Sequence, residues 1–165
     1  MNIAVYGFMG VGKTTVGMLL ADKLGYEFVD MDMQIEKNEG ASIKEIFQKH
    51  GEPKFRKLES KLVEKLSQRD RLVISCGGGV VANTINAEVL KSTSKMVYLT
   101  ATIDEILRRS SSDNSRPLLN VKNQKEQASK LYEARRPVYS RYADITIDTT
   151  SKTPDEVIDA ILEEL

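Results

Sequence analysis

A glycine-rich stretch near the N-terminus, GFMGVGKTT over residues 7–15, contains the residue types best suited to chemistry. Gly7, Gly12, Lys13 and Thr14 fit G-x-x-x-x-G-K-S/T, the P-loop pattern, in which backbone N–H groups and a helix N-terminus cradle phosphate oxygens. The lysine of this pattern supplies a positive charge, and the threonine hydroxyl is placed to bind Mg²⁺. The sequence therefore predicts a nucleotide site. The motif alone does not separate an ATPase, a GTPase, a small-molecule kinase and a nucleotide sensor.

Two aspartates follow the second apolar segment, in DMDMQIE over residues 30–36. Asp30 lies where a strand is expected to end, which is the edge at which open α/β sheets bind ligands, and Asp32 follows two residues later. One carboxylate can hold the water shell of a metal while the other accepts a hydrogen bond from an attacking hydroxyl. An aspartate at such a junction is often only a helix N-cap. Neither aspartate has Glu or Gln three residues later, so no capping box explains the pair.

Three consecutive glycines, in CGGGV over residues 76–80, follow the third apolar segment. Many P-loop enzymes end this strand with a metal-binding aspartate, and here that acid is absent. A glycine run lets a ligand approach the backbone and offers N–H groups to it. Since a tight turn seldom needs three glycines, the pattern favours the wall of a substrate site over a plain turn.

Arginine is concentrated in the second half of the chain, where six of the nine arginines fall between residues 108 and 141. These six are Arg108, Arg109, Arg116, Arg135, Arg136 and Arg141. Arginine is the residue suited to bidentate contacts with anions. Arg56, in Phe55-Arg56-x-x-Glu59, and the Arg135-Arg136 pair stand on expected helices, where each alone is more often surface charge. They become ligands for an anionic acceptor only if they converge on one pocket.

The polar stretch over residues 110–124 fits neither helical nor strand periodicity and contains Arg116. It suits either a plain surface loop or a lid over a phosphate site.

Composition limits the classes of function. The 165 residues suit one domain, and Lys plus Arg balances Asp plus Glu at 24 each, which argues against a general nucleic-acid or anionic-membrane binder. The longest apolar stretches are strand-sized and no charged leader precedes an apolar segment, so we expect a cytoplasmic protein, and a monomer. One cysteine, Cys76, and one histidine, His50, exclude a Cys/His zinc cluster. His50 is expected to lie solvated at a helix C-terminus.

Apolar segments alternate with helical ones along the chain. The expected strands cover residues 2–6, 26–29, 71–75, 95–99 and 143–147. The first helix is expected over 14–25 with Gly25 as its C-terminal cap, and three capping boxes begin at Ser42, Thr102 and Thr153. This alternation predicts an α/β protein with a five-stranded parallel sheet between two helical layers.

Six motifs together resemble the shikimate kinase family over essentially the whole chain. They are GFMGVGKTT, FVDMDMQIE (28–36), FRKLE (55–59), GGG (77–79), RPLL (116–119) and ARRPVY (134–139). The resemblance implies one shikimate kinase-like domain over 1–165 with a lid at 110–124, and a P-loop kinase fold similar to that of nucleoside monophosphate kinases. It also implies that ATP and Mg²⁺ are used to phosphorylate the 3-hydroxyl of shikimate, a cyclic carboxylic acid with three hydroxyls. The products would be shikimate 3-phosphate and ADP, on the route to aromatic amino acids.

The resemblance further implies roles for individual residues. The implied catalytic residues are Lys13, Asp32, as base or orienting group, and Arg116, which reaches the transferring phosphoryl group from the lid. The implied nucleotide-binding residues are Gly10, Val11, Gly12, Lys13, Thr14, Thr15, Arg116 and, beside adenine, Arg108 and Pro154. The implied shikimate-binding residues are Asp32 at the ring hydroxyls, Arg56 and Arg135 at the carboxylate, and Gly77, Gly78 and Gly79 along the ring. Mg²⁺ would be held by Thr14 and, through water, Asp30.

Three other hypotheses remain open. A kinase for another small hydroxylated compound would not need two arginines aimed at a carboxylate. A ligand-sensing or scaffold protein would bind shikimate or nucleotide without turnover, but Lys13, Thr14, Asp32 and Arg116 are all present. A P-loop NTPase that regulates a protein partner is disfavoured by the missing acid after the third strand and by the arginine-containing lid.

Overall fold

The computed structural model describes residues 1–110 and 124–165. Arg116 and nearly all of the predicted lid therefore lie outside the described residues. The elements are β1 Asn2–Gly7, α1 Lys13–Leu24, β2 Glu27–Asp30, α2 Met31–Glu39, α3 Ile43–Ser67, β3 Leu72–Ser75, α4 Thr84–Thr93, β4 Ser94–Thr100, α5 Ile103–Ser110, α6 Gln124–Tyr142, β5 Ile145–Asp148 and α7 Pro154–Glu164.

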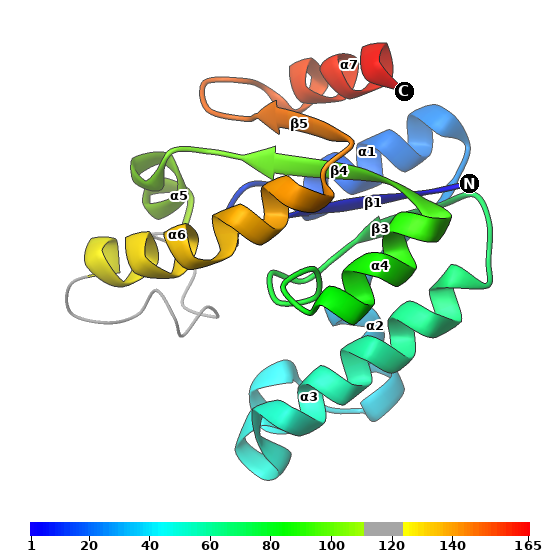
Figure 1. Ribbon diagram of the computed structural model, residues 1–165, viewed down its shortest axis with the longest axis vertical. Helices are drawn as coiled ribbons and strands as arrows, with labels where there is room; N and C mark the ends of the chain where they lie inside the picture. Colours follow the sequence, from blue (N-terminus) through cyan, green and yellow to red (C-terminus); the bar gives the residue numbers. More distant parts are fainter. Residues whose placement is uncertain (111–123) are drawn as a thin grey trace.

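The five strands form one sheet in the order β2-β3-β1-β4-β5, and every neighbouring pair is parallel. β1 lies at the centre, with Ile3 opposite Val73 of β3 and Lys95 of β4. Figure 1 shows β5 and α7 at one edge of the sheet and α3 beyond the other. Because all strands run in one direction, their carboxyl ends lie along one edge of the sheet, where ligands of open α/β sheets bind. The predicted five-stranded parallel sheet is confirmed.

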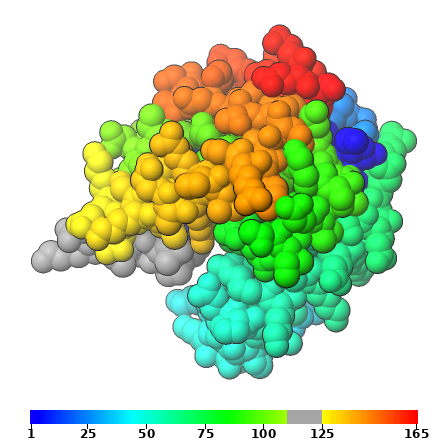
Figure 2. Space-filling view, in the orientation of Figure 1, coloured from blue at the N-terminus to red at the C-terminus, as the bar shows by residue number. Residues whose placement is uncertain are grey.

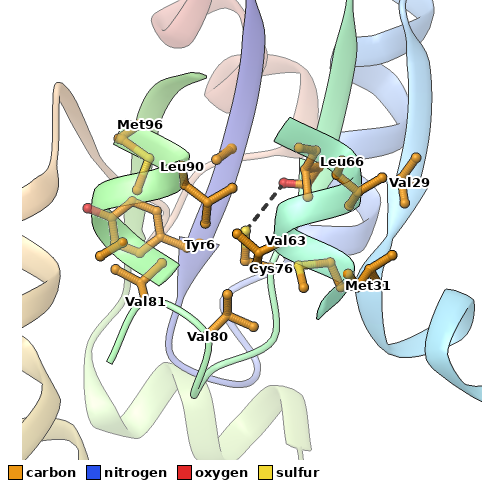
Figure 3. Packing of buried hydrophobic residues seen from close by; sticks show 14 of the residues in the cluster. Tyr6, Val29, Met31, Val63, Leu66, Cys76, Val80, Val81, Leu90 and Met96 are labelled. Carbon is orange, nitrogen blue, oxygen red and sulfur yellow. Dashed lines mark hydrogen bonds between the residues drawn. The ribbon is translucent and has the colours of Figure 1, made fainter. Parts of the chain in front are cut away.

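Both faces of the sheet are buried, as the apolar strands require. Ile3 and Val5 of β1 belong to a core that α1, α5 and α7 complete. Ala4 and Tyr6, which alternate with them, belong to a second core completed by α2, α3, α4 and the C-terminal half of α6. Figure 3 shows part of this second core, with Tyr6 packed near residues of α4 and β4. The predicted three-layer α/β/α arrangement is thus confirmed.

The helix boundaries follow the capping signals in the sequence. Gly25 adopts the left-handed conformation (φ 65°) at the end of α1. The side chains of Ser42, Thr102 and Thr153 each accept a hydrogen bond from the backbone N–H three residues later. All three predicted helix starts are confirmed.

Helix α3 is interrupted at Gly51, whose φ of 78° and ψ of 174° are not helical. The exposed His50 therefore ends a first helical segment, as its position before a glycine predicts. A second segment carries Arg56 and Glu59. The last strand begins at Ile145 rather than at residue 143, because α6 continues to Tyr142. The Asp144 carboxylate, between the two elements, accepts a hydrogen bond from Met96 N at 2.8 Å and pairs with Lys91.

Within the described ranges, no helix combines the length and the apolar character that crossing a membrane would require.

Candidate active site

The P-loop lies between the carboxyl end of β1 and the start of α1. Gly12 adopts a left-handed conformation (φ 94°) immediately before α1, and in the described part of the chain no side chain caps this helix and no acid occupies its first turn. The first N–H groups of α1 therefore remain as donors at the positive end of the helix dipole. Gly7 cannot carry a side chain, since a Cβ there would lie 2.3 Å from the carbonyl oxygen of Leu99. The geometry is that of an anion site.

The lysine of the motif reaches back over this loop. Lys13 Nζ donates to the carbonyl oxygens of Gly7, at 2.9 Å, and Phe8, at 3.1 Å. Its charge is therefore held beside the backbone donors that the motif provides for phosphate. Thr14 and Thr15 lie exposed in the first turn of α1.

Asp30 connects the P-loop to α2. Its Oδ2 accepts a hydrogen bond from Thr14 Oγ1 at 2.9 Å, and its Oδ1 accepts one from Met33 N at 3.0 Å. Asp30 is thus the N-cap of α2, a role that the absence of a capping box did not exclude, because an N-cap aspartate needs no glutamate three residues later. The hydroxyl of Thr14 and a carboxylate oxygen nevertheless lie together, and both are oxygen ligands of the kind Mg²⁺ prefers.

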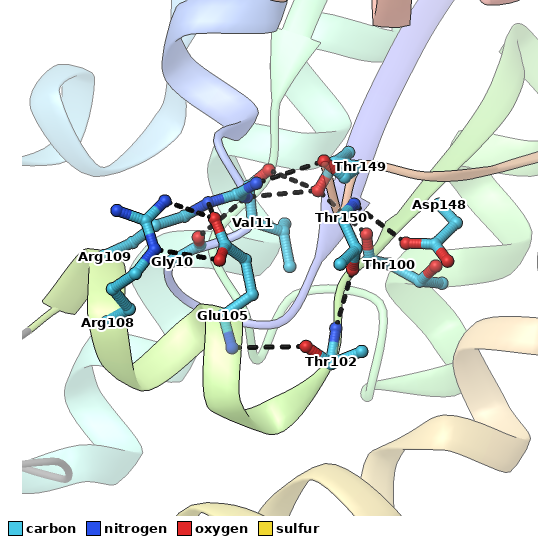
Figure 4. Close-up of polar contacts among 10 residues, drawn as sticks. All are labelled: Gly10, Val11, Thr100, Thr102, Glu105, Arg108, Arg109, Asp148, Thr149 and Thr150. Carbon is cyan, nitrogen blue, oxygen red and sulfur yellow. Dashed lines mark hydrogen bonds and ion pairs between the residues drawn. The ribbon is translucent and has the colours of Figure 1, made fainter. Parts of the chain in front are cut away.

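A polar network holds the P-loop from the side of β4 and β5 (Figure 4). Arg109 Nη1 donates to the Gly10 carbonyl at 3.4 Å and to Thr149 Oγ1 at 3.1 Å, while its Nη2 donates to the Thr149 carbonyl at 3.1 Å. Thr149 Oγ1 also donates to the Thr100 carbonyl at 2.9 Å and lies 3.5 Å from the carbonyl oxygen of Val11. We call Glu105, Arg109 and Thr149 the donor brace.

Glu105 anchors the donor brace by pairing with Arg109 at 2.9 Å and also with Arg108. Hydrogen bonds from the two guanidinium groups, first that of Arg108, lower the pKa of Glu105 from 4.5 to about 2. Arg108, which the family resemblance places beside adenine, is 71 % exposed, whereas Arg109 contacts the P-loop. Pro154 is exposed in the first turn of α7, in the segment that follows Thr149. The i,i+4 spacing of Glu105 and Arg109 was the sequence signal for the brace.

The three glycines after β3 bring the other predicted residues together. A Cβ on Gly77 would lie 3.0 Å from Asp32 Oδ1, and one on Gly78 would lie 2.9 Å from Arg135 Nη1. A Cβ on Gly79 would lie 2.2 Å from Arg56 Nη1. A side chain at any of the three positions would have to displace Asp32, Arg135 or Arg56, because these side chains of α2, α6 and α3 approach the same turn. We call residues 77–79 the glycine turn.

Glu59 also lies at the glycine turn, where it is buried, and the sequence motifs predicted no role for it. It is 1 % exposed and its Oε1 pairs with Arg56 Nη1 at 2.7 Å. Burial raises the pKa of Glu59, and the ion pair with Arg56 opposes that rise. Its i,i+3 spacing from Arg56 was visible in the sequence, but its burial was not. Arg56 also pairs with Glu52 at 3.2 Å, so two carboxylates hold one guanidinium group at the turn.

Of the two adjacent arginines on α6, only Arg135 contacts the glycine turn. Arg136 is 60 % exposed and lies 3.7 Å from Glu133 on its own helix. Arg135 and Arg136 therefore allow a matched comparison between an arginine in the candidate site and its neighbour outside it.

The glycine turn lies beside the P-loop, since a Cβ on Gly78 would be 4.0 Å from the carbonyl oxygen of Gly7. Figure 2 shows a hollow in the surface between the cyan start of α3 and the yellow-to-orange helix α6. An anion site for phosphates and a second cluster with two guanidinium groups and two carboxylates are therefore neighbours at the carboxyl edge of the sheet. A P-loop kinase that acts on a small anionic molecule has this arrangement.

Comparisons with known proteins identify the family. The family model described as shikimate kinase matches residues 9–165. A shikimate kinase of Persephonella marina is 44% identical over 161 residues, which cover 98% of this chain and 96% of that protein. The solved structure of shikimate kinase from Acinetobacter baumannii in complex with shikimate is 40% identical, covers 98% of this chain and 90% of that chain, and superposes with a TM-score of 0.94.

The chain belongs to the shikimate kinase family. The family, enzyme class and function predicted from the six motifs are thereby confirmed. A gluconokinase from Sinorhizobium meliloti, 15% identical, covers 99% of this chain and 90% of that chain with a TM-score of 0.59, a likeness that shows the fold alone. The fold therefore accommodates different acceptors, and the acceptor must be argued from the site.

Proposed function

We propose that this chain transfers the terminal phosphoryl group of ATP to the 3-hydroxyl of shikimate, with ATP at the P-loop and shikimate at the glycine turn. The observation that carries the proposal is the approach of Asp32, Arg56 and Arg135 to three successive glycines beside Gly7. The Acinetobacter baumannii relative, which was solved in complex with shikimate, supports this acceptor.

Arg56 and Arg135 are proposed to bind the carboxylate of shikimate. Guanidinium groups form charge-assisted, often bidentate hydrogen bonds with carboxylates, and these two lie against neighbouring glycines of one turn. The pairing with buried Glu59 keeps the Arg56 guanidinium at the turn before the acceptor arrives. Fixing Arg56 in advance reduces the entropy that binding costs.

Asp32 is proposed to accept a hydrogen bond from the attacking hydroxyl and to direct its oxygen towards the donor. Its carboxylate lies against Gly77, on the same turn as the proposed carboxylate clamp, so one rigid acceptor can contact both. Phosphoryl transfer depends on such positioning and on charge stabilisation more than on covalent chemistry.

Lys13 and the first N–H groups of α1 are proposed to hold the phosphates of ATP, with Gly10, Val11, Gly12 and Thr15 in the surrounding loop. The Thr14 hydroxyl and, through water, the Asp30 carboxylate would hold Mg²⁺, which when bound neutralises charge on the phosphates. Arg116 is proposed, on the family resemblance, to reach the transferring phosphoryl group. Arg108 and Pro154 are proposed to contact adenine, and Arg109 is the better placed of the two adjacent arginines to support the loop.

We further propose a single domain over 1–165 with a lid at 110–124, acting as a cytoplasmic monomer without nucleic-acid or membrane partners. The balanced charge of 24 basic and 24 acidic residues supports the absence of nucleic-acid and membrane partners.

Release of ADP, measured with shikimate, gluconate and nucleoside monophosphates as separate acceptors, tests the proposal. We expect turnover with shikimate and only background release with the others. Shikimate binding without ADP release would favour the ligand-sensing alternative. ADP release that does not depend on shikimate would favour an NTPase.

A further inference from the structure

The glycine turn is part of a β-turn, and the peptide group between its two central residues could face either side of the turn. Val80 N donates to the carbonyl oxygen of Gly77 at 3.1 Å, so Gly78 and Gly79 are the two central residues. Types I and II of such a turn differ by a flip of the central peptide, and type II needs a positive φ at the third residue. Glycine adopts positive and negative φ angles equally readily, so it fits either type of turn. Neither Gly78 nor Gly79 has a positive φ, so the structure contains one of two orientations that the sequence allows.

Tyr139 of α6 holds this central peptide. Its hydroxyl donates to the carbonyl oxygen of Gly78. The side chain is 1 % exposed, and burial raises the pKa of Tyr139, so the hydroxyl keeps the proton that it donates at neutral pH. No peptide bond among the described residues is cis, so holding the Gly78 carbonyl also directs the Gly79 N–H to the opposite side of the turn.

Tyr139 is itself fixed by two tyrosines of the sheet. Tyr6 Oη donates to the Tyr139 carbonyl at 2.6 Å, and this carbonyl belongs to the last turn of α6, where the helix offers it no partner. The rings of Tyr6 and Tyr98 lie 5.6 and 5.4 Å from the ring of Tyr139 in edge-to-face contacts. Because Tyr6 directly precedes Gly7, a continuous set of contacts joins the start of the P-loop to the glycine turn.

We propose that Tyr139 is a positioning residue that locks the Gly78–Gly79 peptide in one orientation and thereby keeps the acceptor site formed. The catalytic consequence rests on the proposed placement of shikimate at the glycine turn. Without the hydroxyl, the peptide samples both orientations, and the apparent affinity for the acceptor falls by the fraction of molecules that remain competent. Loss of one hydrogen bond of ordinary strength predicts a change of about three- to tenfold.

The test compares Tyr139→Phe with Tyr142→Phe. Tyr142 lies on the same helix, and its hydroxyl donates to Glu88 Oε1 at 3.0 Å instead of to the turn. We expect Tyr139→Phe to raise the KM for shikimate about three- to tenfold with the KM for ATP unchanged. Tyr142→Phe should change neither constant. A KM for shikimate equal to that of the wild type in Tyr139→Phe would overturn the catalytic part of the inference.

Relaxation-dispersion NMR of the backbone amides of residues 77–80 reads the peptide orientation without reference to catalysis. Microsecond-to-millisecond exchange should appear in Tyr139→Phe and be absent in the wild type and in Tyr142→Phe. Absence of exchange in Tyr139→Phe would overturn the lock itself. Tyr6→Phe, which leaves the Tyr139 hydroxyl in place, provides a second variant and should show a smaller change in both measurements.

Failure of the proposed acceptor site is distinguishable from failure of the lock. If Arg56→Lys and Arg135→Lys leave the KM for shikimate unchanged, shikimate does not bind at the glycine turn, whatever Tyr139→Phe does. If those variants raise the KM and Tyr139→Phe does not, the site stands and the lock is rejected.

Discussion

The donor and acceptor halves of the site lie side by side but are built differently. The donor half comes from one continuous stretch, the P-loop and the first turn of α1, and the groups proposed to bind phosphate there are mainly backbone N–H groups. The acceptor half is assembled from side chains of α2, α3 and α6 around a turn after β3. This contrast explains why one motif suffices to recognise a phosphate site, whereas an acceptor site becomes visible only when distant segments meet.

The two halves also differ in what supports them. The donor brace holds carbonyl oxygens of the P-loop through Arg109 and Thr149, and its carboxylate, Glu105, lies near the surface. In the acceptor half the supporting carboxylate, Glu59, is buried, and it contacts a proposed ligand directly. Variants of the supporting residues should therefore separate the two halves kinetically.

The largest effect is expected where the halves meet, at the transferring phosphoryl group. Replacing Arg116 by alanine should lower kcat by about 10³ if, as proposed, its guanidinium group stabilises charge that develops on the transferring phosphoryl group in the transition state. The KM for shikimate should change much less. Steady-state kinetics with both substrates checks this, and Arg136→Ala, which removes an exposed arginine, serves as the control. A fall in affinity with kcat intact would assign Arg116 to binding instead.

The acceptor half should respond next most strongly. Glu59→Gln removes the charge that holds Arg56, and we expect the KM for shikimate to rise about tenfold, as for the loss of a charge-assisted hydrogen bond. The KM for ATP should remain unchanged, because Glu59 pairs with Arg56 and lies against Gly77 of the glycine turn. Equal changes in both KM values would show that the two halves are not independent.

The donor half should show the reverse pattern with a smaller amplitude. Glu105→Gln weakens the pairing that orients Arg109, and we expect the KM for ATP to rise about threefold with the KM for shikimate unchanged. A larger effect on shikimate than on ATP would contradict the assignment of the donor brace.

The same variant gives a dependence of stability on pH. The folded-state pKa of Glu105, about 2, lies below its ordinary value of 4.5, so its stabilising contribution is present above pH 4.5 and lost as the pH falls towards 2. Melting temperatures of the wild type and Glu105→Gln should therefore converge over that interval. A difference that stays constant from about pH 5 to about pH 2 would contradict the lowered pKa.

A change outside both halves should affect stability alone. Gly25 ends α1 with φ 65°, and a Cβ there would contact nothing within 4 Å. Gly25→Ala should therefore lower the free energy of unfolding by about 1 kcal/mol through backbone strain and leave both KM values unchanged. Chemical denaturation and steady-state kinetics of the same preparation measure the two quantities together.

The sequence predicted the features that depend on neighbouring residues. The P-loop, the capped helix starts and the five strands follow from local patterns, and the structure has all of them. The predicted start of β5 was wrong by two residues, because α6 continues to Tyr142 and no strand pattern reveals where the preceding helix ends.

Features that depend on tertiary contacts were harder to predict. Arg108 and Arg109 are both spaced to pair with Glu105 on a helix, at i,i+3 and i,i+4, and only the path of α5 shows that Arg109 is the one that contacts the P-loop. From the sequence alone, Glu59 is indistinguishable from a surface residue of a polar helix, whereas in the structure it is buried beside the glycine turn. Tyr139 lies within the ARRPVY motif, but its hydrogen bond to Gly78 depends on how α6 packs against β1 and β4.

The proposed binding of the acceptor carboxylate by Arg135 and Arg56 at the glycine turn can be tested with shikimate and its carboxamide. The wild type should prefer the carboxylate by about 10² in kcat/KM, and Arg135→Gln should reduce that preference at least about tenfold, because the discriminating charge pair is gone. Arg136→Gln, one residue away and exposed, should keep the wild-type preference. An unchanged preference in Arg135→Gln would show that the carboxylate binds elsewhere.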